Sequence, residues 1–152
     1  MNEQTIAKQC SLPDFVELWN RFQTKLTNGQ RAEIRRSRGP DDLDFMPAFY
    51  RLLPSGQKPD TQWRRVILFL PCAPHNNNAD TLGAQLARSR INEKRLFQIA
   101  RSEPPNDLLY LRRILQQTQP VVNWQQFGEM LYFWGDNRKK KLLEDYFTTI
   151  NQ

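Results

Sequence analysis

The sequence has few of the residues on which catalysis and metal binding most often depend. It contains one histidine, His75, and two cysteines, Cys10 and Cys72, among 152 residues. A single histidine restricts any Ser/His/Asp or Cys/His site to the loop PHNNN, where no metal-ligand spacing surrounds it. We therefore interpret His75 as a solvated loop residue. The two thiols are interpreted as packing residues rather than as a disulfide or zinc ligands.

Long hydrophobic runs and glycine-rich loops are also missing from the sequence. The longest apolar run, VILFL at 66–70, is far shorter than the roughly 20 residues that cross a bilayer. The segment MNEQTIAKQCSL at 1–12 has no hydrophobic signal region, so we expect a cytoplasmic protein without a membrane partner. The six glycines are isolated and form no phosphate-binding loop, which argues against an NTPase.

Strand signals are nearly absent, whereas helical periodicity recurs along the chain. The first apolar stripe repeats at steps of three and four, at Leu12, Phe15, Trp19, Phe22 and Leu26. It predicts an amphipathic helix with Ser11 as its N-cap, which Asn28 and Gly29 end. Trp124 and Trp134 fall on a similar stripe. We assign these tryptophans, with Trp19, to the core rather than to base stacking.

The remaining pattern predicts an all-α fold of two small helical bundles. Short helices are expected at about 30–37 and from Pro47, and the buried segment 60–70 fits a helix better than a strand. Segment 71–81, PCAPHNNNADT, is rich in Pro and Asn and lacks periodicity, so it is the expected linker. The expected units are an N-terminal helical lobe at 1–73 and a C-terminal helical bundle at 80–152.

The charge of the chain is positive and unevenly distributed. Lys and Arg total 22 against 16 Asp and Glu, a net charge of +6 that favours anionic partners such as nucleic acid. Segment 28–38 carries a net +3 and segment 88–102 a net +4, while 40–44 holds three Asp in five residues. Basic residues are thus concentrated in particular elements.

Segment 88–102 combines its five cations with a helical apolar pattern. One helical face is expected to carry four polar residues, Arg90, Lys94, Gln98 and Arg101. The apolar side of the same helix is expected to carry Ile91, Leu96, Phe97 and Ala100. One acid cannot pair five cations. The face is either solvated, paired with the Asp-rich segment, or bound to a phosphate backbone. The arginine pairs 35–36 and 112–113 are further clusters of cations, and they favour binding to a phosphate backbone.

The acidic segment leaves a second chemistry open. Asp41, Asp42 and Asp44 could hold a metal for a nuclease, but carboxylates at a helix start explain them without an ion. A further alternative is a free-standing helical DNA-binding regulator in which 28–38 forms part of a helix-turn-helix. That protein would bind one duplex sequence specifically. Arginine pairs spread over several helices fit non-specific backbone contact better than a single recognition helix.

Five segments resemble a known family in order and spacing. They are AEIRR (32–36), MPAFYRL (46–52), RINEKRLFQIAR (90–101), LRRIL (111–115) and LLEDYF (142–147). Together they are similar to the small subunit (CasB) of the type I-E CRISPR Cascade complex. The resemblance implies an all-helical, non-catalytic subunit, present in two copies, with no cofactor or metal. It would brace the crRNA and target DNA and give the displaced non-target strand a basic path.

The resemblance also implies partners and site residues. The partners would be the backbone, large and crRNA-processing subunits of Cascade, a second copy of the chain, crRNA, and both DNA strands. Arg51 lies among aromatics and is equally consistent with an ion pair to an Asp inside the fold. The expected nucleic-acid-binding residues are Arg35, Arg36, Arg51, Arg90, Lys94, Arg95, Arg101, Arg112 and Arg113.

Overall fold

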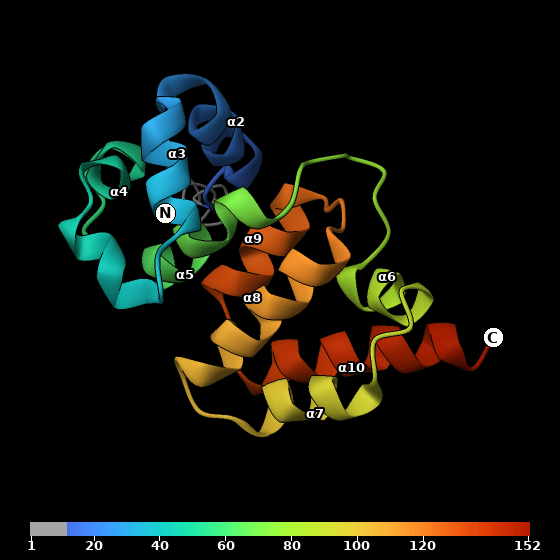
Figure 1. The fold of residues 1–152 in the computed structure, drawn as a ribbon. Helices are drawn as coiled ribbons and strands as arrows, with labels where there is room; N and C mark the ends of the chain where they lie inside the picture. Colours follow the sequence, from blue (N-terminus) through green and yellow to red (C-terminus); the bar gives the residue numbers. More distant parts are fainter. Residues whose placement is uncertain (1–11) are drawn as a thin grey trace, which may run out of the picture.

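A computed structural model describes residues 12–152, and in this range it contains α-helices and two 3-10 turns but no strand (Figure 1). The predicted all-α class is confirmed. None of the helices in this part of the chain is long and apolar enough to span a bilayer. The elements in chain order are α2 (Phe15–Lys25), α3 (Asn28–Arg35), η1 (Pro40–Phe45), α4 (Pro47–Leu52), α5 (Thr61–Phe69), η2 (Leu70–Cys72), α6 (Leu82–Arg88), α7 (Glu93–Arg101), α8 (Asn106–Thr118), α9 (Trp124–Tyr132) and α10 (Asp136–Ile150).

The first two helices begin at residues other than those predicted. Asp14, whose side chain accepts from the Glu17 N–H, is the N-cap of α2 in place of Ser11, which lies outside the described residues. Leu12 precedes the helix and is 49% exposed, so it is not part of the buried stripe. Asn28 begins α3 instead of ending α2, because Thr27 and Gln30 form a capping box.

Helix α5 is the central buried helix, as its apolar run predicts. Its side chains from Val66 to Phe69 are fully buried, and α9 packs against both α5 and α2. Gly128 on α9 makes this approach possible, since a Cβ there would lie 2.3 Å from Cγ of Phe15. Trp124 is also fully buried, in agreement with its assignment to the core, while Trp19 and Trp134 are half-buried at the edge of the core.

A second group of helices lies at the other end of the molecule. Figure 1 shows α6, α7 and α10 side by side, with α8 and α9 between them and the N-terminal helices. Helices α6 and α10 are in close contact at Gly83, where a Cβ would lie 2.6 Å from the carbonyl oxygen of Leu142. Helix α8 packs against α7 on one side and η2 on the other, and so connects the two groups.

Segment 71–81 is hydrogen-bonded to the start of α9. The Val122 N–H donates to the Pro74 carbonyl at 3.0 Å, and the Trp124 N–H donates to Nδ1 of His75 at 3.0 Å. The prediction of a solvated histidine is therefore wrong: His75 is half-buried, caps α9 and lies against the Trp19 ring. The division into two lobes at this segment stays a prediction, and α9 packs with the N-terminal helices although it follows the segment.

Candidate nucleic-acid interface

Several arginines bind the C-terminal ends of helices. Arg65 donates from Nε to the Leu131 carbonyl at 2.7 Å and from Nη2 to the Tyr132 carbonyl at 2.6 Å, at the end of α9. Arg31 binds the end of α2, and Arg21 binds the end of α4 in the same manner. The last carbonyls of a helix have no intrahelical partner and carry the negative end of its dipole, so a cation stabilises them. Burial lowers the pKa of Arg65.

Arg112 belongs to this internal group rather than to the surface. It is 5% exposed, and its Nη2 donates to the carbonyls of Ile34 at 3.0 Å and Arg35 at 3.1 Å, at the end of α3. Its Nη1 donates to the Ser37 carbonyl. A guanidinium committed to these acceptors has no free donor fork for a phosphate. We therefore assign Arg112 a structural role, in contrast to its prediction as a nucleic-acid ligand.

The sequence contained a signal for the position of Arg112. It lies four residues after Leu108 and three residues before Leu115. Both leucines are buried, so Arg112 falls on the apolar face of α8. Lys139 is placed in the same way, three residues before buried Leu142. A cation at such a position is overlooked when only apolar residues are used to predict the buried face of a helix.

The remaining candidate cations lie on the surface. Arg95 is half-buried, and none of these cations forms an ion pair with any residue between 12 and 152. The ion pair considered for Arg51 is thus not found in this part of the chain, where Arg51 is exposed at the end of α4. The exposed members are Arg35, Arg36, Arg51, Arg90, Lys94, Arg101 and Arg113.

Segment 88–102 is not one helix, which corrects the predicted face. Helix α6 ends at Arg88 and α7 begins at Glu93, and Arg90 between them has a φ of 61°. The Arg90 N–H donates to Ala87 and the Ile91 N–H to Leu86, which is the Schellman pattern of a helix C-terminus. Arg90 and Lys94 therefore do not lie on one helix.

The buried face of α7 also differs from the predicted one. Leu96 and Ile99 are buried, whereas Phe97 is half-buried and the Arg101 guanidinium lies 5.1 Å from the centre of its ring. Ile91 is buried as predicted, but it precedes the helix. The exposed face retains Lys94 and Arg101.

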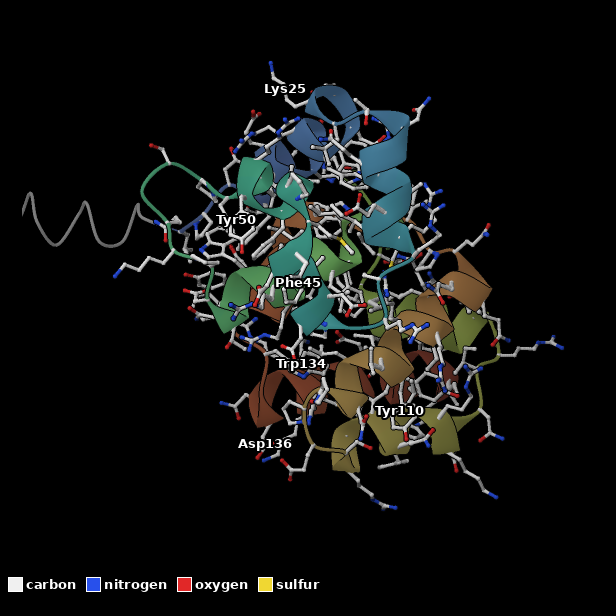
Figure 2. All side chains as sticks on the ribbon, turned by 60° about the vertical axis from the view of Figure 1, so that its left-hand side comes forward. Lys25, Phe45, Tyr50, Tyr110, Trp134 and Asp136 are labelled. Carbon is white, nitrogen blue, oxygen red and sulfur yellow. The ribbon has the colours of Figure 1, made fainter. Side chains whose placement is uncertain are left out.

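Arg95 and Arg113 come together at a small hollow between α7 and α8. The hollow has a volume of about 140 Å³ and is also lined by Gln98 on α7 and by Tyr110 on α8, which is labelled in Figure 2. Nη1 of Arg95 donates to Gln117 on α8 at 2.6 Å, which orients its guanidinium toward that helix. Two guanidinium groups at one hollow present donors of the kind that phosphate oxygens accept from.

The exposed side of α8 leads from this hollow toward α3. Gln116 and Gln117 are exposed three and four residues after Arg113, and thus lie on the same face of the helix. Gln116 also lines a hollow of about 500 Å³ together with Arg35. We call the surface formed by Arg95, Arg113, Gln116 and Arg35 the basic track. Arg51, at the end of α4, lines neither of these hollows.

Three comparisons with known proteins agree with this architecture. A model of the family described as CRISPR-associated protein Cse2 matches residues 30–147. The chain is 34% identical over 154 residues to CRISPR system Cascade subunit CasB of Escherichia coli (strain K12), covering 91% of this chain and 96% of that protein. A chain in a crystal structure of E. coli Cascade bound to a PAM-containing double-stranded DNA target superposes with a TM-score of 0.81 and 35% identity, covering 91% of this chain and 97% of that chain.

These matches define the class of the protein as a helical subunit of the kind found in CRISPR surveillance complexes. The chain belongs to the Cse2 family. The resemblance found in its five sequence segments is thereby confirmed.

Proposed function

We propose that this chain is a non-catalytic subunit of an RNA-guided CRISPR interference complex that stabilises the R-loop through the nucleic-acid backbone. The observation that carries the proposal is the basic track, in which arginines from α7, α8 and α3 have no carboxylate partner between residues 12 and 152. Its ligands would be crRNA and the target and displaced strands. The chain would act in the cytoplasm.

The chemistry of the track fits phosphate better than a base edge. Arginine presents a planar fork that binds phosphate oxygens, and an amide such as that of Gln116 donates to a neighbouring oxygen. R-loop formation exchanges one duplex for another of similar stability, so a few backbone contacts shift the balance. Sequence is read by the guide, and the subunit needs only to bind the strand without regard to its bases.

The partners follow from the relatives. CasB is a Cascade subunit, and the matching chain was crystallised within Cascade on double-stranded DNA. We extend this to the present chain and propose contacts with the backbone, large and crRNA-processing subunits and with a second copy of itself.

The acidic segment has structural contacts that account for two of its carboxylates. Oδ1 of Asp44 accepts from Nε of Arg64 at 2.8 Å, and Oδ2 of Asp42 accepts from the Arg38 N–H at 2.7 Å. Within residues 12–152 no group of three His, Cys, Asp or Glu side chains is arranged to hold a metal ion. The nuclease alternative therefore has no observation in its favour, and the proposed role does not require a catalytic centre.

The salt dependence of binding tests the proposal. Arg95 and Arg113 are replaced together by Gln, and a control variant carries Lys25→Gln and Lys58→Gln, two exposed cations elsewhere with the same total charge change. Binding to fluorescent single-stranded and duplex DNA of unrelated sequences is measured across salt concentrations. The slope of the logarithm of the binding constant against the logarithm of the salt concentration should become shallower for the first variant. The expected change is about 1.4 on single strands and about 1.8 on duplex, while the slope of the control variant stays close to that of the wild type.

Two outcomes contradict the proposal. Equal slopes for both variants and the wild type place the phosphate contacts elsewhere. Much tighter binding to one duplex sequence than to the others supports the free-standing regulator instead.

A further inference from the structure

The second hollow along the basic track is larger than contacts with a phosphate backbone require. It has a volume of about 500 Å³, against about 140 Å³ for the hollow beside Arg95 and Arg113. Pockets that hold small organic molecules have volumes of about 300 to 1,000 Å³, so the second hollow is of a size that takes a ring system and the first is not. We call it the Arg35 hollow. It lies between the end of α3, segment 71–74 and the end of α8.

The Arg35 hollow has apolar walls and polar residues at the surface. Segment 71–74 contributes two prolines and a buried alanine, and α8 contributes the buried Leu115. The exposed lining side chains are one guanidinium and two amides, those of Arg35, Gln116 and Gln119. Among its lining residues between 12 and 152 there is no carboxylate. A nucleobase has apolar faces and a polar edge, and proteins hold an unstacked base between apolar side chains with hydrogen bonds to that edge.

Hydrogen bonds hold the walls of the Arg35 hollow in place without a ligand. The Ala73 carbonyl accepts from Nε1 of the buried Trp124 at 2.9 Å, which fixes segment 71–74 to α9. The Arg35 carbonyl accepts from Nη2 of Arg112 at 3.1 Å, and this contact joins the end of α3 to α8. A site whose walls are already ordered loses little conformational entropy when a ligand enters it.

The Arg35 hollow continues directly from the phosphate contacts of the basic track. Ile114 lines the first hollow and Leu115 the second, so adjacent residues of α8 face the two spaces. Arg113 and Gln116 are separated by about 4.5 Å along the helix axis, compared with a rise of about 3.4 Å per nucleotide in a stacked strand. A strand whose phosphates lie at Arg113 therefore reaches the Arg35 hollow with its next nucleotides.

We propose that the Arg35 hollow receives one unpaired nucleobase of the strand that lies along the basic track. Leu115 and segment 71–74 cover the faces of the base, the amides of Gln116 and Gln119 bind its edge, and Arg35 binds an adjoining phosphate. Amides both donate and accept, so the hollow requires a base without selecting one. The inference rests on the proposed function, because the strand has to follow the track.

The proposal also distinguishes between the strands of an R-loop. Bases of the target strand are paired with the guide, and a paired base enters a pocket only after it has been unpaired and unstacked, which costs free energy. Bases of the displaced strand are free. The displaced strand is therefore the ligand that the Arg35 hollow favours.

Two single strands with the same number of phosphates measure the contribution of the bases. One is fluorescent oligo-dT, and the other has the same length and label but consists of abasic units. Binding of the full-length wild-type chain to each is measured across salt concentrations. Oligo-dT should bind about tenfold more tightly, as expected for one base held against the protein, and both strands should give the same salt slope because their phosphate contacts are the same.

Substitutions of Cys72, a half-buried residue that lines the hollow, test where the base binds. Cys72→Phe places a ring in the space and should lower the affinity for oligo-dT to that for the abasic strand, with the salt slope unchanged. Cys72→Ala leaves the space open and is the matched control, which should keep the tenfold preference. Thermal unfolding shows whether each variant is folded at the temperature of the binding experiment.

A cross-link to the wild-type chain locates the base without any substitution, and decides the question if Cys72→Phe does not fold. Oligo-dT that carries one 4-thiothymidine is irradiated in the complex, and the modified residues are identified by mass spectrometry. The adducts should fall within 71–74 or 115–119, and annealing the probe to oligo-dA should abolish them.

The outcomes separate the Arg35 hollow from the basic track. Equal binding of oligo-dT and the abasic strand, with a salt slope that Arg95→Gln and Arg113→Gln still reduce, overturns the base site and leaves the track intact. A preference for bases that Cys72→Phe retains, or adducts confined to other segments, places the base elsewhere and also overturns it. Failure of the proposed function differs from both, since neither strand then binds at low salt, and the inference falls with it.

Discussion

Nζ of Lys139 lies 3.0 Å from Oδ2 of Asp107, and the two side chains are 10% and 0% exposed. Nε1 of Trp134 donates to the same carboxylate at 2.9 Å, and Lys139 also donates to the Ser102 carbonyl at 3.0 Å. The cluster connects the starts of α8 and α10 with the end of α7. Charged groups at this depth persist only when they are paired and hydrogen-bonded, so the pair is a sensitive point of the fold.

Replacement of Asp107 by Asn should destabilise the protein by about 3 to 5 kcal/mol, because it leaves the Lys139 ammonium buried without a counter-charge. Urea unfolding followed by tryptophan fluorescence measures the loss. The double variant Asp107→Asn, Lys139→Met removes both charges and should recover most of it. A double variant as unstable as the single one would show that the charge pair is not the cause.

Substitutions of the neighbouring residues Arg112 and Arg113 should have different effects, the first on the stability of the fold and the second on DNA binding. Arg112→Ala leaves buried carbonyls at the end of α3 without donors and should cost about 3 kcal/mol of unfolding free energy. Arg113→Ala should change stability by less than about 0.5 kcal/mol and lower the DNA salt slope by about 1. Both quantities are measured for each variant under conditions in which it is folded. The reverse pattern would place Arg112 at the nucleic acid.

Arg90 occupies a left-handed backbone conformation that glycine adopts without cost. Arg90→Gly should therefore stabilise the fold by about 0.5 to 1 kcal/mol relative to Arg90→Ala, which removes the same charge but keeps the strained φ. Thermal unfolding of the two variants compares them directly. Equal midpoints would mean that the Schellman turn after α6 relaxes to another conformation.

The Cys72 thiol gives the stability a dependence on alkaline pH. Burial raises its pKa, while the nearby Arg112 only partly opposes the shift. The thiol therefore stays protonated to a higher pH in the folded state than in the unfolded state, where it ionises at about pH 8.5. Stability is full below that value and falls as the pH rises through it. Cys72→Ala should reduce this fall between about pH 8 and pH 10 in urea unfolding. An unchanged pH profile would contradict burial of the thiol.

Apolar periodicity was sufficient to predict the class of the fold and most helices. Phe15, Phe22 and Leu26 of the first stripe and the run within α5 are buried as expected, because helix packing requires such faces. The identity of the polar contacts was less accessible. Local sequence does not show that His75 would meet α9 from 49 residues away, or that the chain would turn at Arg90 without a glycine.

The candidate site was predicted as a set of cations and not as a surface. Arg112 and Arg113 are adjacent in LRRIL, yet one caps α3 inside the protein and the other lines the hollow beside α7. Tertiary packing decides between them, since a helix turns by about 100° per residue. Three internal arginines, Arg31, Arg65 and Arg112, place part of the excess positive charge of the chain at helix C-termini, where the helix dipole favours a cation.

The lifetime of the R-loop in the assembled complex is the most direct test of the basic track. Complexes that contain wild-type chain, the Arg95→Gln, Arg113→Gln variant or the Lys25→Gln, Lys58→Gln control are loaded on a supercoiled target, and re-annealing of the displaced strand is followed over time. The track variant should shorten the lifetime at least about tenfold, equally for unrelated target sequences and more at high salt, with the control unchanged. Equal lifetimes in complexes with full subunit occupancy would contradict the account.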